Sequence, residues 1–81
     1  MKNIDDNIKI VFIKHFKIKN KKTLSYKIKV SEIPGFDSIG WAIIVTSLEA
    51  KFNTEFNLSE FSGNETLREF INIVKKQIKN V

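Results

Sequence analysis

The chain has 81 residues, 42% of them hydrophobic, and its 14 Lys and Arg against 9 Asp and Glu leave a formal net charge of +5. This length allows one small domain, expected over residues 1–81, and the absence of cysteine excludes a disulfide framework and a thiolate zinc site. No apolar run approaches the ~20 residues of a membrane span, and the N-terminus lacks the basic-then-apolar order of a signal peptide, which predicts a cytoplasmic protein.

The first predicted element is a helix over about residues 4–16. Its apolar residues, among them Ile8 and Phe12, recur with helical spacing, and two aspartates place negative charge in the first turn, where the helix dipole favours it. The flanking residues favour helix over a strand. The only histidine of the chain, His15, falls near the end of this helix, where we expect a packing or helix-terminus role.

A long basic segment, residues 17–36, follows this helix. Residues 1–36 carry nine Lys and three acids, or +6, whereas residues 37–70 carry two bases and six acids, or −4. Tyr26 to Val30 alternates like a strand, but no partner strand is visible. We therefore predict a loop held by a few apolar anchors and closed by a type II turn with Pro34 and Gly35 at its centre.

A second helix is predicted from Ser38 to Phe52, with Asp37 as its N-cap and Asn53 as a left-handed C-terminal residue. One apolar stripe predicts the core-facing side of this helix: Trp41, Ile44, Val45, Leu48 and Phe52. A second strip lies on another side and is wider than burial of one face requires: Ile39, Ala42, Ile43 and Thr46.

The remaining elements are one short helical turn over residues 57–61 and a last helix that begins near Thr66. The Thr66-x-x-Glu69 spacing is a capping box. The expected buried stripe of the last helix is Leu67, Phe70, Ile71, Val74 and Ile78. Three main helices and one short helix predict an all-α four-helix bundle with a long loop between helices one and two.

Catalytic constellations are absent from the sequence. A nucleophilic triad would need His15 beside Ser38 with an orienting carboxylate, and nothing in the local sequence promises this. Metal-ligand spacing and a phosphate-binding glycine loop are also missing. We therefore expect neither an enzyme nor a metal site.

The segment around Ser38 has a distinctive order of residues. Asp37-Ser38-Ile39 opens the second predicted helix, which ends in Leu48-Glu49-Ala50-Lys51-Phe52-Asn53-Thr54-Glu55-Phe56, and a short turn and the Thr66-Leu67 helix follow. This order resembles the acyl carrier protein family, including its peptidyl and aminoacyl carriers, from about Ile33 to Val74. The family's signature is Asp-Ser-Leu at the start of the second of four helices.

The resemblance implies that a phosphopantetheinyl transferase attaches 4′-phosphopantetheine from coenzyme A covalently to Ser38, and that the new thiol carries acyl or aminoacyl groups as thioesters. It also implies that Asp37 helps to position the metal and coenzyme A in the transferase complex. An acyl- or aminoacyl-loading ligase and a downstream acyltransferase or synthase are the other implied partners. The residues agree with this placement, because an anion on a helix N-terminus is favoured by about 0.3 to 1 kcal/mol.

The same resemblance implies that partner enzymes recognise the exposed side of the second helix. That side is usually strongly acidic, but here Ile43 and Ala50 stand where acidic residues are common. This departure favours a dedicated pathway over general fatty-acid synthesis, in a carrier expected to act as a monomer. The expected partner-binding residues are Ile39, Ala42, Ile43, Thr46 and Glu49.

The cargo is expected to be a short acyl or aminoacyl group, because four phenylalanines would leave little room inside the bundle. Trp41 is expected to pack against Phe61, with a position at the border of the cargo cavity as the alternative.

A different class of function uses the basic segment. Lysines between Lys17 and Lys29, with Tyr26 for stacking, would suit a nucleic-acid-binding module, although lysine-rich loops are more often simply solvated. A carrier fold that has lost modification and acts only through protein contacts is a third possibility, which the intact Asp37-Ser38 pair argues against.

Overall fold

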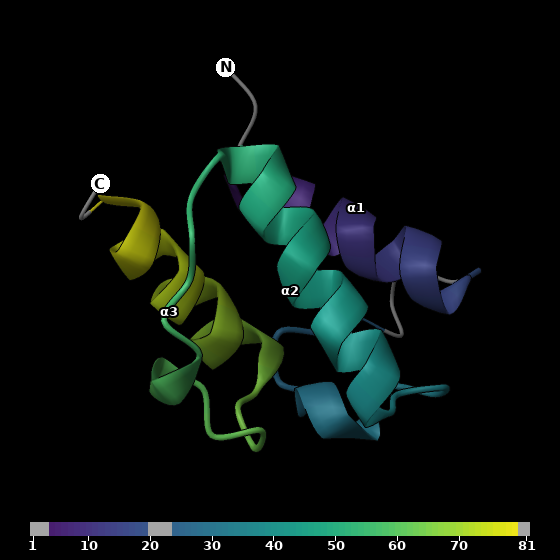
Figure 1. The fold of residues 1–81 in the computed structure, drawn as a ribbon. Coiled ribbons are helices and arrows are strands. Elements are labelled where there is room, and N and C mark those ends of the chain that lie inside the picture. Colours follow the sequence, from purple (N-terminus) through teal and green to yellow (C-terminus); the bar gives the residue numbers. More distant parts are fainter. Residues whose placement is uncertain (1–3, 20–23, 80–81) are drawn as a thin grey trace.

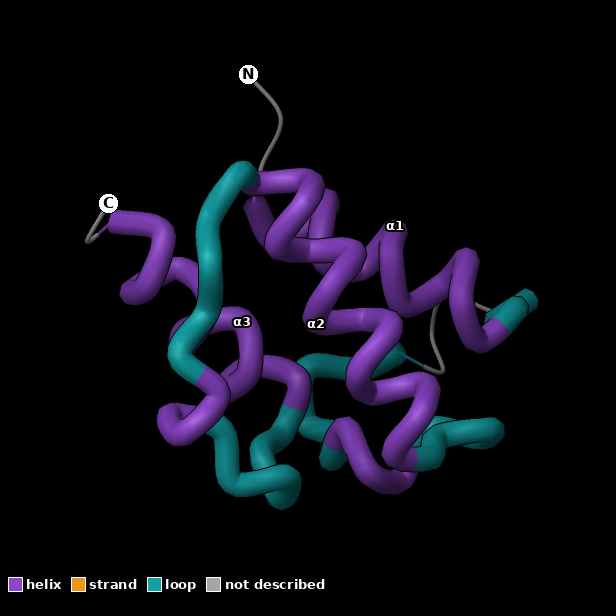
Figure 2. Tube along the Cα trace, viewed as in Figure 1, coloured by secondary structure: helices purple, strands orange, loops and turns teal. Residues whose placement is uncertain are grey.

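The computed structural model describes residues 4–19 and 24–79, which form a helical bundle without strands in those ranges (Figures 1 and 2). Three α-helices surround the core, and α2 lies between α1 and α3 in the view of Figure 1. The elements in chain order are α1 (Ile4–Phe16), the 3₁₀ helix η2 (Val30–Glu32), α2 (Ser38–Phe52), the 3₁₀ helix η3 (Leu58–Glu60) and α3 (Leu67–Lys79). No helix among the described residues is long and apolar enough to cross a membrane.

The predicted bounds of α1 and α2 are confirmed. Asp37 caps α2 in an extended conformation, with its Oδ1 accepting a hydrogen bond from the Gly40 N–H, and Asn53 ends the helix in the left-handed conformation. The turn before α2 closes with a hydrogen bond from the Phe36 N–H to the Ile33 carbonyl oxygen (3.0 Å), and Gly35 adopts the positive φ of 89° that a type II turn requires.

The loop between α1 and α2 has a partner that the sequence did not reveal. The backbone N–H groups of Leu67 and Arg68, in the first turn of α3, donate to the carbonyl oxygens of Ile28 (2.8 Å) and Tyr26 (3.1 Å). The first N–H groups of a helix have no partner within the helix, so the loop supplies acceptors for them. The strand-like alternation therefore reflects pairing with a helix terminus, and the only bridge among the described residues joins Lys29 to Thr66.

Of the two short elements, one confirms the sequence prediction and the other differs from it. The short helical turn predicted over residues 57–61 is confirmed as the 3₁₀ helix η3, which Asn57 caps through its side chain. Residues 30–32, predicted as loop, form η2, and Val30 within it is 1% exposed. The capping box of α3 is confirmed, since Thr66 and Glu69 exchange side-chain to backbone hydrogen bonds.

The core lies between the predicted apolar stripes of the three helices, with additional residues from the loop. Phe12, Leu48 and Phe70 are fully buried and come from α1, α2 and α3 in turn. Leu24, Val30 and Ile33 are the buried anchors that hold the loop. Trp41, Phe52 and Ile78, predicted for the core, are partly buried and pack against its edge.

Candidate functional site

Ser38 is the first residue of α2 and is exposed to solvent. Its position follows from the cap, because the side chain of Asp37 turns back to Gly40 and fixes where the helix begins (2.6 Å). The hydroxyl therefore lies at the end of the helix where backbone N–H groups are free and where the helix dipole attracts negative charge. This arrangement suits a serine that bears a phosphodiester.

The start of α2 packs closely against the end of α1. Gly40 is buried, and a Cβ atom at this position would lie 3.0 Å from His15 Nε2 and 3.1 Å from Asp37 Oδ1. A residue with a side chain would press against both groups, so the glycine permits the close approach of the two helix ends. His15 thus packs at the end of α1, in keeping with the packing role expected as one of its two possibilities, and it lies near the cap of the helix that presents Ser38.

The strip predicted as a partner face is exposed, as expected from its position on α2. Ile39 is 71% and Ile43 is 44% exposed, which is unusual for large apolar residues in so small a chain. Together with Ser38 they border a shallow, open groove of about 440 Å³. We call it the strip groove; its lining residues are Ser38, Ile39, Ala42, Ile43, Thr46 and Ser47.

A second groove, of about 460 Å³, lies between α2 and the segment that follows it. Its lining includes Glu49, whose Oε2 accepts a hydrogen bond from the Phe56 N–H (2.8 Å) and so holds this segment against the helix. Glu49, predicted as part of the partner face, therefore lies in this second groove. The full lining is Trp41, Ala42, Val45, Thr46, Glu49, Glu55, Phe56, Asn57 and Leu58.

Aromatic side chains fill the interior beneath these grooves. Trp41 contacts Phe61 and Phe70 edge-on, with ring centroids 5.6 and 5.4 Å apart, and Phe70 also contacts Phe12 at 5.4 Å. Trp41 thus packs against Phe61 as expected, and it also borders the second groove. Both grooves are open to the surface.

The sequence did not single out Leu58 or Glu55 as site residues. Leu58 is 57% exposed and is an apolar residue in a short turn that is otherwise polar. That contrast is a signal that sequence reasoning could have used. Glu55 gave no signal, because its place beside α2 depends on the fold of the segment after the helix.

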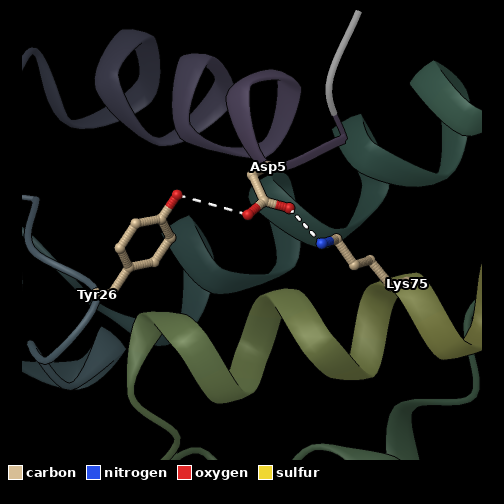
Figure 3. A network of polar contacts seen from close by, with 3 residues as sticks. All are labelled: Asp5, Tyr26 and Lys75. Atoms are coloured by element: carbon tan, nitrogen blue, oxygen red, sulfur yellow. Dashed lines mark hydrogen bonds and ion pairs between the residues drawn. The ribbon is translucent and has the colours of Figure 1, made fainter.

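The basic segment takes part in a network on the side of the molecule formed by α1 and α3 (Figure 3). Lys75 Nζ lies 2.7 Å from Asp5 Oδ1, and the Tyr26 hydroxyl donates a long hydrogen bond of 3.5 Å to Asp5 Oδ2. The hydrogen bond from Lys75 lowers the pKa of the Asp5 carboxyl against the opposing effect of burial, and Tyr26 and Arg68 lower it further. The network therefore joins α1, the loop and α3.

Tyr26 is occupied within this network. Lys9 Nζ lies 3.9 Å and Arg68 Cζ 4.3 Å from the centre of its ring. These contacts engage the aromatic ring that the nucleic-acid hypothesis offered for stacking on bases. Two of the lysines on which that hypothesis also depended, Lys21 and Lys22, lie outside the described residues.

Metal ligands are not gathered anywhere in residues 4–19 and 24–79. No group of three or more His, Cys, Asp or Glu side chains in these ranges could hold a metal ion.

The family model described as the phosphopantetheine attachment site matches residues 35–74. This match begins in the turn before α2, includes Asp37 and Ser38, and extends into α3. The matched segment therefore carries a phosphopantetheine attachment site and is similar to the acyl carrier protein family, whose members bear 4′-phosphopantetheine as a covalent prosthetic group and act as carriers. No curated protein matches the chain.

Proposed function

We propose that a phosphopantetheinyl transferase modifies Ser38 and that the chain then carries acyl or aminoacyl groups as thioesters to the enzymes of a dedicated biosynthetic pathway. The observation that carries this proposal is the exposed Ser38 hydroxyl at the capped start of α2, within the residues that the family model matches. In the transfer, the serine oxygen forms a phosphodiester and the adenosine bisphosphate portion of coenzyme A leaves. The prosthetic group supplies a thiol, which a chain without cysteine lacks.

Asp37 supports this role in two ways. Its Oδ1 fixes the first turn of α2, and its carboxylate is exposed next to the serine, where it can help to position the metal and coenzyme A of the transferase. The free N–H groups of the same turn favour the phosphodiester once it has formed.

The partner face in this proposal is the exposed apolar strip of α2 that begins beside Ser38. Ile39 and Ile43 offer apolar contact to a partner, and Ala42 and Thr46 line the same groove. Docking then depends more on apolar burial than on long-range attraction between charges, so we expect it to respond weakly to salt. We propose that the carrier itself catalyses no reaction and that its partners supply the chemistry.

The test is loading of the full chain by a broad-specificity transferase with coenzyme A, followed by intact-mass measurement. The wild-type chain should gain the mass of one phosphopantetheine, and Ser38→Ala should gain none. Ser47→Ala is the matched control, because Ser47 is also an exposed serine of α2 that borders the strip groove. This variant should load like the wild type.

Circular dichroism checks that Ser38→Ala keeps its helices, as expected for the loss of an exposed hydroxyl that does not serve as the cap. Mass gain in Ser38→Ala would contradict the proposal. A wild-type chain that a competent transferase leaves unmodified would favour an adaptor that acts through protein contacts alone.

A further inference from the structure

The second groove, between α2 and the segment after it, has the features of a ligand site. We call it the cargo groove and define it by its apolar wall, Trp41, Ala42, Val45 and Leu58, and by its carboxylates, Glu49 and Glu55. Its volume of about 460 Å³ lies in the range of small-molecule sites, which are mostly apolar with a few polar groups. Ala42 and Thr46 also line the strip groove, so the two grooves are neighbours on α2.

The distance from Ser38 matches the length of a phosphopantetheine arm. The arm has 13 bonds between its phosphorus and its sulfur, the length of about four extended residues, or roughly 15 Å. Along α2, at about 1.5 Å per residue, Thr46 lies about 12 Å and Glu49 about 16 Å beyond Ser38. An arm laid along the exposed strip therefore brings its sulfur to the cargo groove.

The charges around this groove select among possible acyl groups. Glu49 and Glu55 are its two charged lining residues, and residues 37–70 have a net charge of −4. Glu49 is fixed by its hydrogen bond with the Phe56 N–H, so its carboxylate is held in place before any ligand arrives. A cationic group is attracted to such a site, whereas a carboxylate on the cargo is repelled.

We infer that the cargo groove receives the acyl group on this chain's own arm and prefers an acyl group that bears a positively charged amine, as in an aminoacyl thioester. This inference rests on the proposed modification of Ser38. The apolar wall contacts the carbon chain, and Glu49 and Glu55 hold the ammonium group. A neutral acyl group gains only the apolar contact, and an acyl group with a free carboxylate is disfavoured.

The experiment loads the full chain with three coenzyme A analogues, in which an amide replaces the labile thioester. The acyl groups are β-alanyl, butyryl and succinyl, which end in an ammonium, a methyl and a carboxylate. Intact mass confirms each loading. The Trp41 indole N–H and the Leu58 amide then report occupancy of the groove by NMR, with nuclear Overhauser effects between the acyl methylenes and Trp41 as a direct test of contact.

The β-alanyl group should occupy the groove roughly two- to fivefold more than butyryl, the range expected for one partly exposed ion pair, and succinyl should occupy it least. Glu55→Gln should reduce the β-alanyl signal to the butyryl level. Asp6→Asn, which removes an exposed carboxylate of α1, is the matched control and should leave the signal unchanged. Glu49→Gln is a second variant, in which the amide oxygen can still accept from the Phe56 N–H.

Equal occupancy by β-alanyl and butyryl, or a β-alanyl signal that survives both glutamine variants, would overturn the inference about cargo while leaving Ser38 modification intact. Absence of loading with all three analogues would instead overturn the proposed function, and this inference with it. Intact mass distinguishes these two results before any NMR measurement.

Discussion

The two sides of the molecule use their side chains differently. On the side formed by α1 and α3, Asp5, Tyr26 and Lys75 engage one another across three segments that are far apart in the sequence (Figure 3). On α2, large apolar residues such as Ile39 remain exposed, within one continuous stretch that begins at Ser38. The first side contributes to the fold, whereas the outer side of α2 is free to serve binding. Changes on the two sides should therefore have separable effects.

The sharpest test of this separation uses two residues of α2. Leu48 is fully buried, and Leu48→Ala should cost about 2–5 kcal/mol through lost burial and the cavity left behind. A chain of this size has a free energy of unfolding of roughly 3–5 kcal/mol, so the variant should be largely unfolded or close to it. Ile43 is 44% exposed, and Ile43→Ala should change stability by less than about 0.5 kcal/mol.

Urea denaturation followed by circular dichroism measures both variants. Ile43→Ala should keep its unfolding midpoint and accept the prosthetic group like the wild type, but transfer its cargo to partner enzymes less well. An unfolding midpoint that falls as far for Ile43→Ala as for Leu48→Ala would show that the outer face also stabilises the fold.

Gly40 lies where the end of α1 meets the start of α2. Its replacement should lower the stability less than Leu48→Ala does. An alanine in a helix is normally favoured over glycine by about 1 kcal/mol, but here its Cβ would press on His15 and on the Asp37 cap. Overpacking of this kind typically costs about 1–3 kcal/mol, so we expect a net loss of about 1 kcal/mol.

A double-mutant cycle identifies the cause of this loss. In the background of His15→Ala, which removes the imidazole 3.0 Å from the new Cβ, Gly40→Ala should be neutral or stabilising. An equal loss in both backgrounds would assign the strain to Asp37 alone. The loading rate by the transferase reports whether the start of α2 has moved.

The helices could be predicted because their signals are local. The Asp37 cap, the left-handed Asn53 and the Thr66-x-x-Glu69 box lie within or beside the helices that they delimit, and each has the predicted geometry. The pairing of the loop with α3 could not be predicted in this way. It depends on carbonyl groups of Tyr26 and Ile28 meeting N–H groups about forty residues away, which no local pattern specifies.

In the candidate site, too, the features set by local sequence could be predicted and those set by tertiary packing could not. The exposed serine and the apolar strip are properties of one helix and its periodicity, so the sequence was sufficient to find them. The cargo groove needs a second segment, in which Glu55 and Leu58 are brought to α2 partly by the bond from the Phe56 N–H to Glu49. The approach of His15 to the cap of α2 likewise arises from the packing of two helices.

The polar network should show the smallest of these effects. Asp5→Asn removes the charge that pairs with Lys75, and since Lys75 is 37% exposed we expect a cost of only about 0.5–1 kcal/mol at neutral pH. Asp6→Asn is the matched control, because Asp6 is exposed and lies in the same first turn of α1. Asp6 interacts with the helix dipole about as strongly as Asp5 does. The difference in the free energy of unfolding between the two variants therefore measures the contribution of the network.

The pH dependence of this difference gives the stricter test. Folding lowers the pKa of the Asp5 carboxyl below its ordinary value of 3.8, so the carboxylate contributes stability that is present above that value. As pH falls through 3.8 and then through the lower pKa of the folded state, the carboxyl becomes protonated and the contribution disappears. Urea midpoints of the wild type and Asp5→Asn should therefore converge in acid, whereas equal sensitivity of Asp6→Asn to pH would show that the helix dipole, and not the network with Lys75 and Tyr26, is responsible.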